Sequence, residues 1–171
     1  VEEQNNGSAW NIYSGYVWYS STEDSNLVKK EETIVGVNST KVNIDQITSL
    51  QGVHKGLIMG KSEEIDRMQK ELSVKYSDLD FVKSSPTLLE VVLKGVSKKS
   101  AIELVAQEYG VELKDCIAFG DNFNDEAMLK AVGHPFLMEN APENLKNQFE
   151  SKNITLDNNH DGIAEVLQKI K

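Results

Sequence analysis

The sequence has few of the features that define several large protein classes. It contains a single cysteine, Cys116, so an intramolecular disulfide framework is excluded and a cytoplasmic location is expected. No apolar run approaches the ~18 residues that a membrane-spanning helix needs. Neither a Gly-x-Gly-x-x-Gly string nor a Walker string occurs. An unrelated Rossmann-like nucleotide binder is therefore disfavoured.

Basic residues are in the minority. The chain has 18 Lys and Arg against 27 Asp and Glu, which gives a net charge of −9 over 171 residues. Nucleic acids and anionic membranes need a basic surface, so neither is expected as a partner. A small phosphorylated metabolite remains compatible, because one bound cation and one lysine can reverse the local field.

The pattern of apolar residues changes along the chain and predicts two domains, residues 1–86 and residues 87–171. The first part mixes strands and helices. From Lys98 onward helices and strands alternate, which predicts a parallel sheet with helices on its faces. The expected strands are 10–20 (with a bend at Gly15), 53–59, 80–83, 87–93, 115–120, 135–138 and 154–156, and the expected helices include 24–35, 63–75 and 142–149. The length allows two small domains.

The most informative stretch is an apolar run, Ile117–Gly120, that is followed by Asp121 and Asp125. Open α/β sheets build ligand sites at the carboxyl ends of strands, and two carboxylates there suit Mg²⁺. A purely structural interpretation stays open, because Asn122 is a plausible helix N-cap with Asp125 three residues further on.

A second polar residue of interest is Lys98, which stands in Gly95-Val96-Ser97-Lys98-Lys99-Ser100 between a strand and a helix. A lysine at a helix amino terminus is mildly unfavourable, so it indicates an anionic ligand there; a solvated lysine is the alternative. A right-handed crossover would bring Lys98 and the aspartate pair to the same edge of the sheet.

Several strings in this order resemble a known family. The span from about Leu89 to the carboxyl terminus is similar to the end of a haloacid dehalogenase (HAD) superfamily phosphatase of the Cof type. The matching strings are Gly95-Val96-Ser97-Lys98, Gly120-Asp121-Asn122-Phe123-Asn124-Asp125, Met128-Leu129, Gly133-His134-Pro135-Phe136, Met138-Glu139-Asn140-Ala141 and Asp161-Gly162. Tyr13-Ser14-Gly15 and Trp18-Tyr19 resemble a strand of that family's cap domain less closely. The implied fold class is α/β, with part of a Rossmann-like HAD core (parallel strands with flanking helices) and part of an α+β cap.

The resemblance also implies roles for individual residues. Asp121 would be a direct Mg²⁺ ligand, and Asp125 would either touch the cation through water or orient Lys98. Lys98 would neutralise the transferring phosphoryl group and the nucleophile, and Asn124 would hydrogen-bond the substrate phosphate. The implied reaction is Mg²⁺-dependent hydrolysis of a small phosphomonoester (a sugar phosphate or phosphorylated cofactor) through an aspartyl-phosphate. A non-catalytic module that binds a cation, a phosphate or a partner is the alternative.

The family's nucleophile motif, Asp-x-Asp-x-Thr/Val, is the main departure. The chain's only Asp-x-Asp, Asp78-Leu79-Asp80, is followed by Phe81-Val82 and so fits this spacing, but it stands in a loop before an expected strand and does not follow an apolar strand. For this reason we reject it as the nucleophile motif. We therefore expect that the amino-terminal part of such an enzyme is absent and that this chain alone is inactive. Without the nucleophile strand, strand 115–120 would be an exposed apolar edge, which favours self-association or coverage by another segment.

Overall fold

The computed structural model describes residues 7–21 and 25–170 and divides into two compact units. The first unit is Val1–Lys94 and the second unit is Gly95–Lys171. The boundary thus lies later than the expected position between residues 86 and 87. The reason is that β6 (Leu88–Leu93) pairs with β4 (Val53–Met59) and β5 (Leu79–Ser85) of the first unit.

The first unit is built on a six-stranded sheet with the order β3-β2-β1-β4-β6-β5. Its pairs are antiparallel, except that β2 and β3 run parallel. The expected strand with a bend at Gly15 is a hairpin, because Gly15 has a φ of 57° and turns the chain between β1 and β2. The remaining elements are β1 (Ala9–Ser14), β2 (Val17–Ser21), β3 (Thr40–Val42), α1 (Asn26–Val35), α2 (Ile44–Ile47) and α3 (Ser62–Lys75). The first residues of the expected helix 24–35 include Asp24, which lies outside the described residues.

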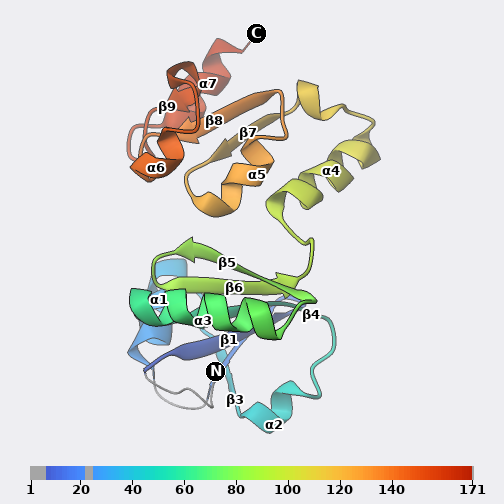
Figure 1. Ribbon diagram of the computed structural model, residues 1–171, viewed down its shortest axis with the longest axis vertical. Helices are drawn as coiled ribbons and strands as arrows, with labels where there is room; N and C mark the ends of the chain where they lie inside the picture. Colours follow the sequence, from blue (N-terminus) through green and yellow to red (C-terminus); the bar gives the residue numbers. More distant parts are fainter. Residues whose placement is uncertain (1–6, 22–24, 171) are drawn as a thin grey trace. The chain divides into compact units, whose positions relative to one another are not determined.

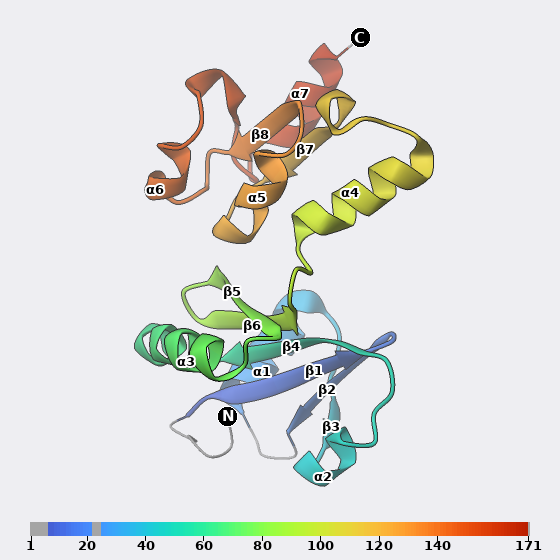
Figure 2. The same ribbon diagram turned by 45° about the vertical axis from the view of Figure 1, so that its right-hand side comes forward.

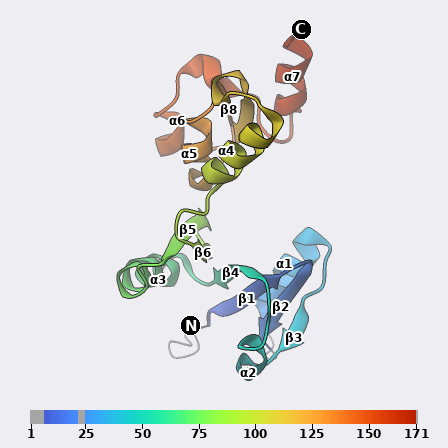
Figure 3. The ribbon, with the colours of Figure 1, turned by 90° about the vertical axis from the view of Figure 1, so that its right-hand side faces the viewer.

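The helices α1 and α3 lie on opposite faces of this sheet (Figure 3). Successive residues of a strand point to opposite faces, and β4 shows this directly. Leu57 packs in one cluster with Val28 of α1, whereas Ile58 packs in another with Ile65 and Met68 of α3. Each face therefore has its own apolar core.

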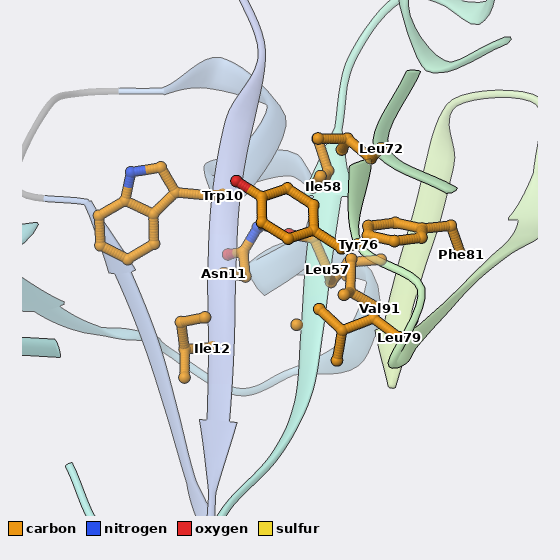
Figure 4. Close-up of a pocket in the computed structure, with 11 residues that line it drawn as sticks. Trp10, Asn11, Ile12, Leu57, Ile58, Leu72, Tyr76, Leu79, Phe81 and Val91 are labelled. Atoms are coloured by element: carbon orange, nitrogen blue, oxygen red, sulfur yellow. Dashed lines mark hydrogen bonds between the residues drawn. The ribbon is translucent and has the colours of Figure 1, made fainter. Parts of the chain in front are cut away.

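Beside α3 the sheet carries an apolar pocket of about 240 Å³. Figure 4 shows Trp10 and Ile12 on the β1 side, with Tyr76, Phe81 and Val91 gathered opposite them. No charged side chain is among the residues that line it. A phosphate group would find no charged partner there, so this pocket is not a candidate phosphate site.

The second unit contains a parallel sheet of three strands with the order β7-β8-β9, as the alternating sequence pattern predicted (Figure 1). The strands are β7 (Ile117–Gly120), β8 (His134–Met138) and β9 (Ile154–Thr155), the helices are α4 (Lys98–Tyr109), α5 (Glu126–Leu129), α6 (Glu143–Lys146) and α7 (Gly162–Lys169), and the 3-10 turns are η2 (Leu113–Asp115), η3 (Phe123–Asp125) and η4 (Ser151–Asn153). The apolar core joins Ala118 of β7 and Leu137 of β8 to Leu129 and Leu145 of the helices. This core fixes the ends of β7 and β8 relative to each other.

The helix α7 lies on the other side of this sheet from α5 (Figure 2). Of the large apolar residues on α7 and directly after it, Val166 is buried, whereas Ile163, Leu167 and Ile170 are each close to half exposed. No helix within the described ranges is both long and apolar enough to cross a bilayer. In the described part of the second unit β7 is an edge strand, paired only with β8.

Candidate active site

The two aspartates singled out by the sequence lie on one turn at the carboxyl end of β7. This turn contains η3 (Phe123–Asp125) and leads into α5. Oδ1 of Asn122 accepts a hydrogen bond from the backbone N–H of Phe123 at 2.9 Å. The capping arrangement expected at Asn122 is therefore present, and it shapes the turn that carries Asp121 and Asp125.

Asp125 is a buried carboxylate whose oxygens both have donors. Only 5% of its side chain is exposed. Oδ2 accepts the backbone N–H groups of Asp121 at 2.9 Å and of Asn122 at 3.2 Å. Oδ1 forms an ion pair with Nζ of Lys98, whose side chain is half exposed. Burying a charge is costly unless the charge is paired and hydrogen-bonded, and Asp125 meets both conditions.

Lys98 reaches Asp125 because α4 begins next to the β7 turn. The backbone N–H of Ser100 donates to Oγ of Ser97 at 3.1 Å, and the backbone N–H of Ser97 donates to Oγ of Ser100 at 2.9 Å. This reciprocal capping box fixes the first turn of α4. The structure thus brings together Lys98 and Asp125, which are 27 residues apart in the sequence.

Gly120, the last residue of β7, leaves the space that the Asp125 side chain occupies. A Cβ at Gly120 would lie 2.4 Å from Cβ of Asp125 and 2.7 Å from its Cγ. Atoms in a packed interior cannot approach so closely, so a side chain here would displace the carboxylate from its donors. The glycine before Asp121 is therefore part of the geometry of the site.

Asp121 has a different environment, because its side chain is exposed at the end of the sheet. Its Oδ2 accepts a hydrogen bond from Nδ2 of Asn140 at 2.9 Å. Asn124 lies within η3 and is partly buried. Asn140 is a site residue that was not expected from the sequence; it lies in the string Met138-Glu139-Asn140-Ala141 after β8.

The carboxylate of Asp121 is better placed than that of Asp125 to bind a cation that prefers oxygen ligands. Both oxygens of Asp125 already accept hydrogen bonds. Its contacts therefore favour the role of orienting Lys98 over the role of touching the cation through water. Among the residues that the structure describes, no three His, Cys, Asp or Glu side chains gather closely enough to bind a metal by themselves. A Mg²⁺ ion at Asp121 would need water and further ligands, as this cation commonly has.

Other polar residues have separate surroundings. His134 begins β8 and is paired with Ile117, at the end of the sheet opposite to Asp121. Nδ1 of His160 donates to Oδ1 of Asp157 at 2.6 Å, and this hydrogen bond is the main reason why the pKa of Asp157 is lowered. Neither histidine contacts the Lys98–Asp125 pair in the interactions that the structure shows.

The profile of the haloacid dehalogenase-like hydrolases matches residues 1–167. The chain belongs to this family. This match confirms the family that the motifs between Gly95 and Gly162 predicted. The chain is therefore a HAD-type hydrolase by family.

Relatives of this HAD-like chain are much longer than the chain itself. A Haemophilus influenzae protein, named provisionally as a phosphatase, is 37% identical over 133 residues, which are 76% of this chain and 50% of the relative. An HMP-PP phosphatase of Yersinia pseudotuberculosis is 30% identical over 151 residues, which are 88% of this chain and 55% of the relative. The chain therefore spans about half the length of the curated relatives that it matches.

A solved structure confirms the fold class. A haloacid dehalogenase-like hydrolase from Bacteroides thetaiotaomicron matches with a TM-score of 0.80 and 28% identity, over 98% of this chain and 63% of that one. The HAD-like chain therefore has the α/β architecture of part of a longer HAD protein.

Proposed function

We propose that this chain carries one half of the active site of a Mg²⁺-dependent HAD-type phosphatase. The reaction would be hydrolysis of a small phosphomonoester, such as a sugar phosphate or a phosphorylated cofactor, through an aspartyl-phosphate. The observation that carries the proposal is the Lys98–Asp125 ion pair, held against the end of β7 on the turn that also presents the exposed carboxylate of Asp121.

Phosphoryl transfer depends mainly on positioning and on neutralisation of charge. Nζ of Lys98 would stabilise the negative oxygens of the transferring phosphoryl group and of the attacking carboxylate. Asp125 holds Nζ in place, because Asp125 is itself fixed by two backbone N–H groups of the turn. The amide of Asn124 would donate to an oxygen of the substrate phosphate.

Asp121 is the residue that would hold Mg²⁺. Its carboxylate is exposed and negatively charged, and oxygen ligands of this kind are the ones that Mg²⁺ prefers. Bound there, Mg²⁺ would supply further positive charge close to the phosphoryl oxygens. Asp121 and Lys98 would then act on the phosphate from the same edge of the sheet.

The attacking aspartate is proposed to come from polypeptide outside these 171 residues, because the chain's one Asp-x-Asp-x-Val string, at residues 78–82, lies at the start of the antiparallel strand β5 of the first unit and not at the end of a parallel strand of the second. A strand that paired in parallel with the open edge of β7 would bring its carboxyl end close to Asp121. Without this strand the aspartyl-phosphate cannot form, so the chain alone should be inactive. The same open edge could pair with another copy of the chain.

Composition and one relative support the proposed substrate class and the proposed cytoplasmic location. The Yersinia relative is an HMP-PP phosphatase, which supports a small phosphorylated metabolite. A net charge of −9 argues against nucleic acid or anionic membrane as a partner. The single Cys116 fits a reducing cytoplasm.

The test compares the 171-residue chain with a longer protein translated from the same reading frame upstream of Val1. We expect the longer protein to contain Asp-x-Asp-x-Thr/Val in the part upstream of Val1 and to hydrolyse p-nitrophenyl phosphate only with Mg²⁺. In that protein Lys98→Met should lower kcat by about 10²-fold or more. Lys99→Met is the matched control, because Lys99 is the next residue and pairs with Glu103 on the surface of α4.

Two results would contradict the proposal. Mg²⁺-dependent hydrolysis by the 171-residue chain would show that its site needs no further strand. An unchanged kcat in Lys98→Met would remove Lys98 from the mechanism. The alternative, a non-catalytic binding module, predicts cation or phosphate binding without hydrolysis by either protein.

A further inference from the structure

A chain of hydrogen bonds links the ends of the three parallel strands of the second unit. Asp121 follows β7, Asn140 follows β8 and Asn158 follows β9. Nδ2 of Asn140 donates to Oδ2 of Asp121 at 2.9 Å, and the backbone N–H of Asn158 donates to Oδ1 of Asn140 at 3.2 Å. Asn140 therefore bridges the candidate cation ligand and the loop after β9.

The orientation of the Asn140 amide is set by its two partners. The backbone N–H of Asn158 can only donate, so it must face the oxygen of the amide. The nitrogen then faces Asp121, whose carboxylate can only accept. Both partners thus require the same orientation, and the Asn140 side chain has one arrangement that satisfies both.

The loop that presents the Asn158 N–H is held by Asp157. Oδ1 of Asp157 accepts the backbone N–H of Asn159 at 2.9 Å and Nδ1–H of His160 at 2.6 Å. The backbone oxygen of Asp157 accepts the N–H of His160 at 3.2 Å. These bonds close a turn around Asn158, so its N–H points to Asn140 from a defined backbone.

We propose that Asn140 is a positioning residue for Asp121. It occupies Oδ2, so that a cation bound at Asp121 would take Oδ1, and it restricts the rotation of the carboxylate before the cation arrives. This inference rests on the proposed function, in which Asp121 is the Mg²⁺ ligand. Partners that hydrogen-bond a metal-binding carboxylate commonly raise metal affinity by fixing its orientation.

An amide is well suited to this task. It donates a hydrogen bond to Asp121 without adding a charge beside the carboxylate, so it does not compete with a cation as a lysine would. Asn140 is exposed, which means that truncation of its side chain leaves no internal cavity. Asn140→Ala should therefore fold.

The experiment uses Mn²⁺ as the probe and measures its binding by titration calorimetry, in the 171-residue chain and in the longer protein. We expect Asn140→Ala to weaken Mn²⁺ binding by about 10-fold or more. Asn140→Ser should lose as much, because a serine hydroxyl is too short to reach both partners. The matched control is Asn144→Ala, an exposed asparagine on α6, which should leave Mn²⁺ affinity unchanged.

A measurement without metal tests the hydrogen-bonded chain itself. Amide hydrogen exchange at Asn158 should become faster in Asn140→Ala, because its acceptor is gone. Unchanged exchange would overturn the bridge. Unchanged Mn²⁺ affinity in Asn140→Ala, with a wild type that binds, would overturn the positioning role and leave Asp121 as the ligand. Failure of both wild-type proteins to bind Mn²⁺ would overturn the cation site itself, and with it the role of Asn140.

Discussion

Asn11 in the first unit and Asp125 in the second are both polar residues that are almost fully excluded from solvent, with exposures of 1% and 3%. Asn11 is neutral, and its partners are groups of the same sheet: Oδ1 accepts the indole N–H of Trp18 at 2.8 Å, and Nδ2 donates to the carbonyl of Leu57 at 3.3 Å. Asp125 is charged, and its partner Lys98 is half exposed.

The difference in partners suggests that the buried polar side chain of Asn11 serves the fold, whereas that of Asp125 serves the candidate site. The bonds of Asn11 join β1 to β2 and β4 and end within the unit. A buried charge contributes little stability compared with a well-packed apolar group, because its desolvation is costly. The charge of Asp125 instead holds a half-exposed lysine at the end of a strand, where it can meet a ligand.

Asp125→Ala should have the largest effect on stability, and the effect should be confined to the second unit. The change leaves two backbone N–H groups and Lys98 without their acceptor, which should lower the free energy of unfolding by about 3 kcal/mol. Urea unfolding would be followed by far-UV circular dichroism and by tryptophan fluorescence. Both tryptophans, Trp10 and Trp18, lie in the first unit, so the fluorescence transition should not move.

The control for this change is Asp115→Ala, which removes an exposed aspartate of η2 in the same unit. It should alter the free energy of unfolding by less than about 0.5 kcal/mol. If Asp125→Ala behaved like this control, the buried ion pair would not be holding the β7 turn. A shift of the fluorescence transition would show instead that the two units unfold together.

Asn11→Leu should give the opposite pattern. The substitution keeps the size of the side chain but removes the acceptor of the indole N–H of Trp18 and one donor to the carbonyl of Leu57. The expected loss is about 2 kcal/mol, seen in the fluorescence transition of the first unit. Because Asn11 has only a structural use in this comparison, the same change in the longer protein should leave kcat for p-nitrophenyl phosphate unaltered. A large fall in kcat would break the distinction between the two residues.

Much of the fold could be predicted from local patterns. The strand 53–59 and the helix 63–75 match β4 and α3 closely, because apolar periodicity and the acidic first turn after Ser62 are local signals. The polar region 37–50 has no clear apolar pattern, and it contains only the short elements β3 and α2. The expected domain boundary came too early, because only the pairing of β6 with β4 shows that β6 belongs to the first unit.

The candidate site could be predicted in part. Asp121, Asp125 and Lys98 stood out because each follows a strand or begins a helix. Asn140 did not, because 19 residues separate it from Asp121 and only the pairing of β7 with β8 brings them together. Contacts between the ends of neighbouring parallel strands depend on register, which a single sequence does not specify.

The smallest expected effect concerns a polar network on the first unit. Oε1 of Glu32 on α1 accepts hydrogen bonds from the backbone N–H of Ser39 at 2.9 Å and from its Oγ–H at 2.5 Å. Nζ of Lys41 lies 3.6 Å from the same oxygen. The hydrogen bonds from Ser39, with a smaller contribution from Lys41, lower the pKa of Glu32. A carboxylate with a lowered pKa stabilises the folded state at pH values above its unfolded pKa, about 4.3, and this stabilisation is lost as the pH falls through the folded pKa.

Glu32→Gln should therefore lower the Tm of the fluorescence transition at neutral pH, and the difference in Tm from wild type should shrink in acid. Glu31→Gln, one position earlier on α1, is the matched control and should leave the Tm at neutral pH close to that of wild type. If Glu32→Gln gave a constant difference at every pH, the charge of Glu32 would not contribute to the stability of the first unit, and the hydrogen bonds from Ser39 would act without it.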